Sequence, residues 1–86
     1  MSNSEFEAAV ARSKSLPQRP SNAELLKLYA LFKQATEGDN TGERPGGFDF
    51  KGIAKYDAWE ELKGKDKATA ESEYIQLVND LEAKYS

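Results

Sequence analysis

The sequence predicts an all-α fold of four helices, with a long loop between the second and third. Apolar residues recur at three- and four-residue intervals in four segments, and no segment shows the apolar–polar alternation of a half-buried strand. A Ser or Asp that can act as an N-cap stands at the start of each segment. The 86 residues are enough for one domain with a small core, so we expect residues 1–86 to form a single domain.

The composition disfavours an enzyme. The chain has no Cys and no His, which removes disulfides, thiolate zinc sites and the side chain that titrates near neutral pH without help. No Gly-rich nucleotide-binding loop and no Ser–His pair is present, so a thioesterase is the weakest of the functions considered. We expect no catalytic residue, no metal and no cofactor.

Charge and hydropathy argue against nucleic-acid binding and against a membrane span. The net charge is −3, whereas nucleic-acid-binding domains are more often basic. The N-terminus has no basic region followed by an apolar run, as a signal peptide would, and the longest apolar run, residues 28–32, is too short to cross a bilayer. We expect a soluble, cytoplasmic protein without stable membrane insertion. A local basic patch could still form from Lys14, Arg19, Lys33, Lys51 and Lys55.

The first helix is expected to start at Ser4 and to stop before Pro17. Ser4 and Glu7 have capping-box spacing, and the residue before a proline is pushed out of the α region. The apolar stripe consists of Phe6, Ala9, Val10 and, at its end, Leu16. Lys14, near the last turn, either complements the helix dipole or contributes to a binding surface.

The second helix follows a stiff, extended linker over residues 17–20. Ser21 and Glu24 repeat the capping-box spacing, and the helix should run to about Glu37, with Gly38 in a left-handed conformation beyond it. The expected core stripe is Leu25, Leu28, Phe32 and Ala35, flanked by Leu26, Tyr29 and Lys33. This apolar arc is wider than one neighbouring helix covers, so something else should cover the remainder.

A loop over residues 39–48 precedes the third helix. It carries three glycines and a proline, and loops this long in small domains tend to be functional or mobile. Asp49 is expected to cap the third helix, which should end before Gly64. The loop is expected to pack on the bundle through Phe48 and Phe50. Trp59, the only tryptophan, is expected in the core, with a ligand contact as the alternative.

The last helix shows the clearest amphipathic pattern. Asp66 is its expected N-cap. Its apolar stripe consists of Ala70, Tyr74, Leu77, Val78, Leu81 and Tyr85, and the opposite face is charged and solvated.

Each of the two middle helices places a lysine beside an aromatic residue. Tyr29 and Lys33 are four residues apart and share a helix face, and Lys55 and Trp59 have the same spacing. This arrangement suits a ligand with a flat ring, a phosphate and an apolar tail. Alternatively, Lys33 extends to water from a tightly packed bundle. A helical interaction module that docks a partner helix would explain the wide apolar arc, but not the two lysines beside aromatics.

Three segments carry a specific residue pattern. They read Tyr29-x-x-Phe32-Lys33-Gln34-Ala35-Thr36-x-Gly38-Asp39, then Arg44-Pro45-Gly46, then Phe50-Lys51-Gly52-x-Ala54-Lys55-Tyr56-Asp57-Ala58-Trp59-x-x-Leu62-Lys63-Gly64. This pattern resembles the acyl-CoA-binding protein family, and the likeness extends from Phe6 to Tyr85. The resemblance implies an up-down-down-up four-helix bundle. It also implies a monomeric, non-catalytic carrier and buffer of long-chain fatty acyl-CoA esters, which serves acyl-CoA-using enzymes transiently in fatty acid metabolism and transport.

The same resemblance implies the ligand contacts. The 3′-phosphate of the ester would be held by Tyr29, Lys33 and Lys55. The adenine would lie against Ala9, Lys14 and Phe32, with Tyr74 close by, and the acyl chain would run along Leu25 and Leu26. The sequence departs from the family at three places: Phe32 stands where many members have tyrosine, Tyr56 replaces a frequent tryptophan, and Thr41-Gly42 interrupts the usual Asn-Thr.

Overall fold

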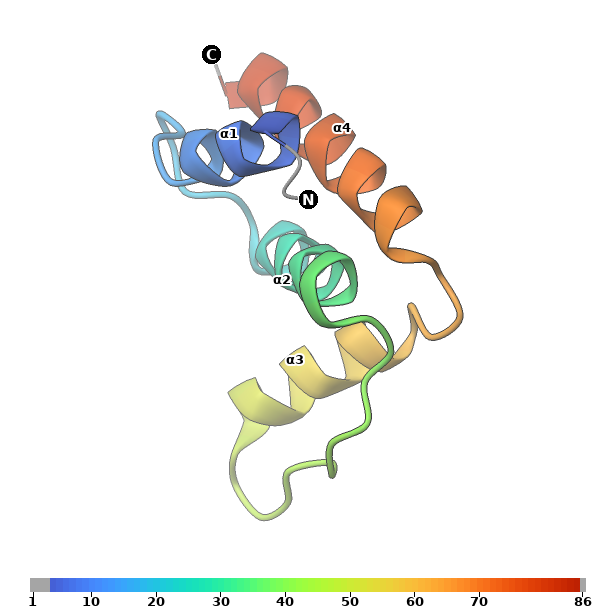
Figure 1. Ribbon diagram of the computed structural model, residues 1–86. Coiled ribbons are helices and arrows are strands. Elements are labelled where there is room, and N and C mark those ends of the chain that lie inside the picture. Colours follow the sequence, from blue (N-terminus) through green and yellow to red (C-terminus); the bar gives the residue numbers. More distant parts are fainter. Residues whose placement is uncertain (1–3, 86) are drawn as a thin grey trace.

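The helix α2 (Asn22–Glu37) is the centre of the fold. The computed structural model describes residues 4–85 and contains three further helices, α1 (Ser4–Ser13), α3 (Phe50–Glu60) and α4 (Lys67–Tyr85). Figure 1 shows α2 between α3 on one side and the pair of α1 and α4 on the other, and α2 contacts both α3 and α4. Two helices therefore cover the wide apolar arc of α2, as its width requires.

Contacts between α2 and α3 show that these two helices run in the same direction. The Lys55 ammonium lies over the Tyr29 ring, and the Lys33 ammonium lies over the Trp59 ring. Within each helix the contacting residues are one turn apart, and their order is the same in both helices.

Contacts of α4 establish the rest of the topology. Glu24 at the start of α2 pairs with Lys84 at the end of α4, whereas Phe32 lies near Tyr74, so α2 and α4 are antiparallel. Two contacts make α1 parallel to α4: Phe6 with Tyr74, and Arg12 with Glu82. The expected up-down-down-up order is confirmed.

Local capping explains where most helices begin and end. Ser21 Oγ accepts the backbone N–H of Glu24 at 3.2 Å, and the Glu24 carboxylate accepts that of Ser21 at 2.8 Å, which confirms the capping box. Gly38 follows α2 with a φ of 82° and a ψ of −150°. The positive φ was expected, but this ψ belongs to an extended conformation open essentially to glycine alone. The predicted caps of α3 and α4 also form, with Asp49 accepting Gly52 N–H and Asp66 accepting Thr69 N–H.

The prediction for the end of α1 is corrected. The helix ends at Ser13, and the chain leaves it through turn bonds from Lys14 N–H to Ala11 O and from Ser15 N–H to Arg12 O. The Ser13 hydroxyl donates to the carbonyl of Val10, a local bond that competes with helix continuation. The linker bends at residues 17–18 instead of running straight.

The hydrophobic core lies where α1, α2 and α4 meet. Its buried members are Phe6, Ala9, Leu28, Leu31, Ala35, Ala70, Tyr74, Val78 and Leu81. Leu28 and Ala35 are buried as expected, but Leu25 is only half-buried and Phe32 is 36% exposed. Three other residues of α2 are buried because helices pack on two of its sides: Ala30, Leu31 and Gln34.

Gln34 joins α2 to α3 and to the segment before α4. Its side-chain Nε2 donates to Asp39 Oδ1 at 2.9 Å and to the Lys65 carbonyl at 2.7 Å, and its Oε1 accepts the Trp59 indole N–H at 3.1 Å. The same indole N–H also reaches the Gly38 carbonyl at 2.9 Å. Trp59 is therefore half-buried and held at its polar edge, instead of lying in the core as predicted.

The prediction that Phe48 and Phe50 pack the loop onto the bundle is wrong. Phe48 is 92% exposed and Phe50 is 70% exposed. The loop is held instead by polar contacts, chiefly the two-pronged ion pair of Arg44 with Asp57 at 2.9 and 3.0 Å. A further bond runs from the hydroxyl of Tyr56 to the carbonyl of Gly42.

Glu24 ties the start of α2 to the end of α4. Its carboxylate accepts a hydrogen bond from the Tyr85 hydroxyl at 2.6 Å and one from Lys84 Nζ at 2.9 Å. These bonds lower the pKa of Glu24 from 4.5 to about 2, and the bond from Tyr85 has the largest effect. Because the folded-state pKa is depressed, the carboxylate stabilises the fold above about pH 4.5, and this contribution is lost as the pH falls towards 2.

We therefore expect Glu24→Gln to lower the melting temperature at neutral pH and to flatten its fall between pH 4.5 and about 2. Thermal unfolding followed by circular dichroism over this range measures the effect. Glu43→Gln, in the exposed part of the loop, is the matched control and should keep the wild-type acid profile. Identical profiles for the two variants would show that Glu24 does not link the helices in solution.

Candidate functional site

Two lysine–aromatic pairs lie side by side where α2 meets α3. Lys55 Nζ is 5.1 Å from the centre of the Tyr29 ring, and Lys33 Nζ is 5.1 Å from the centre of the Trp59 ring. A cation over an aromatic face is attracted by the ring quadrupole. The three residues predicted to meet a phosphate, Tyr29, Lys33 and Lys55, are thus brought to one boundary of the bundle.

Lys33 has a second partner within its own helix. Its ammonium forms an ion pair with the carboxylate of Glu37, one turn later in α2. Glu37 is mostly exposed, and exposed pairs of this kind contribute little to stability. A phosphate that approached Lys33 would therefore compete with a weakly held carboxylate.

A pocket of about 510 Å³ lies beside these pairs, between α2 and α3. Leu25 and Leu26, the predicted acyl-chain residues, form part of its apolar wall, and Tyr29 and Lys55 also line it. Two further cations line the pocket, Arg19 from the linker and Lys51 from α3. Both belong to the basic residues noted in the sequence, but only the fold places them here. The pocket combines an apolar wall with cationic groups, as a ligand with a charged head and an apolar tail requires.

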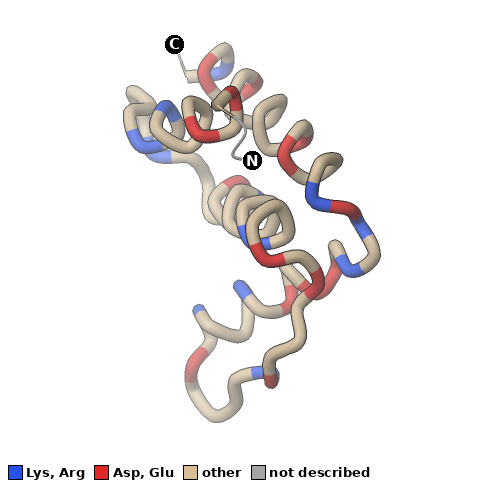
Figure 2. Tube along the Cα trace, in the orientation of Figure 1, with Lys and Arg blue, Asp and Glu red and all other residues tan. Residues whose placement is uncertain are grey.

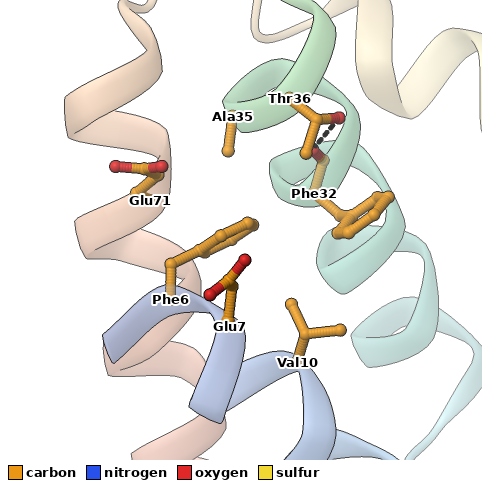
Figure 3. Close-up of a pocket in the computed structure, with 7 residues that line it drawn as sticks. All are labelled: Phe6, Glu7, Val10, Phe32, Ala35, Thr36 and Glu71. Atoms are coloured by element: carbon orange, nitrogen blue, oxygen red, sulfur yellow. Dashed lines mark hydrogen bonds between the residues drawn. The ribbon is translucent and has the colours of Figure 1, made fainter. Parts of the chain in front are cut away.

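A second pocket, of about 420 Å³, lies between α1, α2 and α4 (Figure 3). Phe32 lines it together with Phe6, and their rings are stacked with centroids 6.1 Å apart. The close-up also shows Glu7 of α1 and Glu71 of α4 at this pocket. Phe32, the residue predicted to face adenine, therefore presents an aromatic ring to an open pocket.

The structure does not bring the remaining predicted residues onto that pocket. Ala9 is 0% exposed and lines neither pocket, so its contact with the adenine stays a prediction. Tyr74 is buried behind Phe6 and Phe32; its hydroxyl donates to Ser13, and burial raises its pKa. Lys14 is exposed in the turn after α1 and lines neither pocket.

Residues 4–85 carry neither a cluster of metal ligands nor a helix that could span a membrane. No group of three or more acidic side chains in this range is arranged to hold a metal ion. Within the same range, no helix has the length and apolar character needed to cross a membrane.

The four-helix bundle, with the two pockets described above, defines a small all-α domain that can bind an amphipathic ligand on its surface. The family profile described as "Acyl CoA binding protein" matches residues 3–78. The chain belongs to the acyl-CoA-binding protein family.

Relatives in this family are similar over nearly their whole length. The acyl-CoA-binding protein homolog 1 of Caenorhabditis elegans is 58% identical over 80 residues, covering 93% of each chain. The acyl-CoA-binding protein of Saccharomyces cerevisiae is 56% identical, covering 94% of this chain and 93% of the relative.

Solved structures confirm the bundle. The crystal structure of acyl-CoA-binding protein 2 from Oryza sativa superimposes with a TM-score of 0.90 at 43% identity, over 94% of this chain and 90% of that chain. The solution structure of the yeast protein gives a TM-score of 0.74 at 56% identity, over 94% of each chain.

Proposed function

We propose that this protein binds long-chain fatty acyl-CoA esters and acts as their carrier and buffer in the cytoplasm, as a monomer and without catalysis. Family membership supports the ligand class. The observation that carries the proposal is the pair of lysine–aromatic contacts beside an apolar pocket. Residues 1–86 form one acyl-CoA-binding domain, and enzymes of fatty acid metabolism that make or use acyl-CoA are its transient partners.

The head group of the ester is assigned to the boundary of α2 and α3. Tyr29, Lys33 and Lys55 hold the ribose 3′-phosphate, for which the two ammonium groups supply charge-assisted hydrogen bonds. Each such bond contributes roughly 1.5–3 kcal/mol. The phosphate replaces Glu37 at Lys33 and lies near the cationic end of Lys55.

The adenine and the acyl chain are assigned to the two pockets. The adenine stacks on Phe32 in the pocket between α1, α2 and α4, with Ala9, Lys14 and Tyr74 as the other proposed neighbours of the ring. The acyl chain runs along Leu25 and Leu26 in the pocket between α2 and α3. Stacking of a base on an aromatic side chain contributes about 1–3 kcal/mol.

The structure favours this proposal over a module that docks a partner helix. Such a module needs an open apolar face on α2, but α3 and α4 already pack against α2 on two sides. A thioesterase is disfavoured because the chain has no His or Cys to act as base or nucleophile.

Lys55→Ala or Lys33→Ala should weaken the binding of palmitoyl-CoA by about 2 kcal/mol, because each removes a charged donor from the phosphate. The free energy of unfolding should change by less than about 1 kcal/mol, since a partly exposed cation–π contact contributes little more. Calorimetric titration of each variant measures the first effect, and thermal unfolding measures the second.

The control ligand is 3′-dephospho-palmitoyl-CoA, for which the same substitutions should cost much less. Lys67→Ala, an exposed residue at the start of α4, is the matched control protein and should bind like the wild type. Equal losses with and without the 3′-phosphate would assign the lysines another role. Steady release of free CoA during the titration would contradict the non-catalytic proposal.

A further inference from the structure

A further pocket lies beside the contact between α2 and α3, on the side of α4. Its volume is about 410 Å³, and we call it the Ala58 pocket. Most of its wall is apolar, formed by Ala23, Leu26, Ala30 and Leu31 of α2, by Ala54 and Ala58 of α3, and by Leu62. An alanine side chain ends at Cβ, so these alanines leave apolar space beside the two helix backbones.

The packing of α3 leaves this apolar space accessible. Within residues 4–85, α3 packs on α2 and on no other helix. None of the residues of α3 is buried. An amphipathic helix of a globular protein commonly buries an apolar stripe against its neighbours. The stripe of α3 that includes Ala54 and Ala58 is therefore open to a ligand on the side that faces α4.

The Ala58 pocket continues the pocket of about 510 Å³ that is assigned to the acyl chain, which we call the Leu25 pocket. Leu26 of α2 and Ala54 of α3 line both pockets. Both of these residues are half-buried. Because the two pockets share an apolar wall, an alkyl chain that follows Leu26 in the first pocket has apolar surface beside it as it enters the second.

Charge distinguishes the two pockets. Among the described residues, the Leu25 pocket is lined by three cations and no carboxylate: Arg19, Lys51 and Lys55. The Ala58 pocket is lined by three carboxylates and one cation: Asp57, Glu61, Glu73 and Lys27. Figure 2 shows the basic positions of α3 towards its start and the acidic positions towards its end. A head group that carries phosphates is therefore favoured at the Leu25 pocket, and only an uncharged part of a ligand suits the Ala58 pocket.

We propose that the methyl end of a long acyl chain passes Leu26 and Ala54 and lies in the Ala58 pocket, where Ala58 and Ala23 limit the length of chain that the protein accommodates. This inference rests on the proposed binding of acyl-CoA esters and adds the position of the methyl end. Each CH₂ group that enters the pocket leaves water and gains contacts with the alanine and leucine side chains. An acyl chain is favoured as the occupant because the pocket continues the one assigned to its first part.

Competition titrations with saturated acyl-CoA esters of increasing chain length test the proposal. The measured quantity is the ratio of affinities for the eicosanoyl and the dodecanoyl ester. Ala58→Leu fills the pocket from α3 and should lower this ratio about tenfold or more, because each CH₂ kept in water forfeits up to about fourfold in affinity. Ala23→Leu narrows the same pocket from an exposed position on α2 and should also lower the ratio, even if Ala58→Leu fails to fold. Ala68→Leu, the same change at an exposed position of α4 outside both pockets, is the matched control and should keep the wild-type ratio.

A nuclear Overhauser measurement locates the methyl end directly. Eicosanoyl-CoA labelled with ¹³C at its terminal methyl group should give cross-peaks to the methyl group of Ala58. Cross-peaks to Phe50, at the Leu25 pocket, without any to Ala58 would overturn the proposal, as would an unchanged ratio of affinities in both pocket variants. A dimer that Ala58→Leu converts to a monomer would overturn it in favour of a second copy of the chain as the occupant. In each of these cases palmitoyl-CoA would still bind the wild type, whereas failure of the wild type to bind any ester would overturn the proposed function as well.

Discussion

Palmitoyl-CoA is expected to bind this protein about a thousandfold or more tightly than CoA does, because only the ester can bury an acyl chain against Leu25 and Leu26. At about 0.8 kcal/mol per buried CH₂, a sixteen-carbon chain could contribute up to about 12 kcal/mol before the cost of ordering it. A third of that free energy, about 4 kcal/mol, is enough for a difference of about a thousandfold in the dissociation constant. The acyl chain is therefore expected to contribute as much to the binding free energy as the head group does.

A series of acyl-CoA esters of increasing length, titrated by calorimetry, tests this expectation. Affinity should rise by up to about 0.8 kcal/mol with each CH₂ until the groove between α2 and α3 is filled, and then level off. Trp59 fluorescence should follow the titration, because the ammonium above its ring, that of Lys33, is expected to move onto the phosphate.

Two ligands serve as controls. Free palmitate should hardly bind, because its carboxylate would be buried without the donors that the head group finds. CoA should bind weakly, through its adenine and phosphates without the acyl chain. Equal dissociation constants for CoA and palmitoyl-CoA would contradict the carrier proposal and favour a protein-interaction module.

Helix boundaries could be predicted because capping is a local interaction. Ser21 and Glu24 are three residues apart, so their mutual hydrogen bonds form within one turn and need no tertiary partner. Asp49 and Asp66 cap α3 and α4 for the same reason. The end of α1 differs from the prediction. Pro17 excludes a helix beyond Leu16, but turn bonds already end the helix at Ser13.

Burial on α2 could not be predicted to the same degree. Residues 25–32 are apolar with only two exceptions that carry polar groups, Lys27 and Tyr29, so periodicity does not identify one buried face. Which residues of α2 are buried depends on where α3 and α4 pack, and the sequence of α2 alone does not specify this packing. Phe48 and Phe50 show the same limit, since hydrophobicity favours burial only where the fold supplies a partner.

Those parts of the candidate site that lie within one helix could be predicted from the sequence, and those that join two helices could not. Helical spacing puts Tyr29 beside Lys33 on α2, and Lys55 beside Trp59 on α3. In the structure, however, Lys55 lies over Tyr29 and Lys33 lies over Trp59, because α2 and α3 pack in parallel. Arg19 lines the pocket from the linker that bends at residues 17–18, a tertiary placement that helical spacing does not predict. Gln34 carried no signal of its own, because a polar residue in an amphipathic helix is usually at the surface.

Gln34→Ala is expected to lower the free energy of unfolding by about 3 kcal/mol, because it removes a fully buried side chain whose donors and acceptor are all satisfied. Trp59 and Asp39 keep other partners, the Gly38 carbonyl and the Gly64 N–H. The Lys65 carbonyl loses the donor that Gln34 supplies, and a cavity remains where α2, α3 and the segment before α4 meet.

Urea denaturation followed by circular dichroism measures this change. Gln76→Ala on α4 is the matched control: it makes the same change in helix propensity, but Gln76 is exposed and its side-chain hydrogen bond runs along its own helix, to Asp80. Its effect should stay within about 0.5 kcal/mol. Because Gln34 also positions the indole beneath Lys33, the Gln34→Ala protein that remains folded should bind palmitoyl-CoA more weakly than the Gln76→Ala protein does. Equal stabilities of the two variants would show that the buried amide does not hold α3 and the segment before α4 to α2.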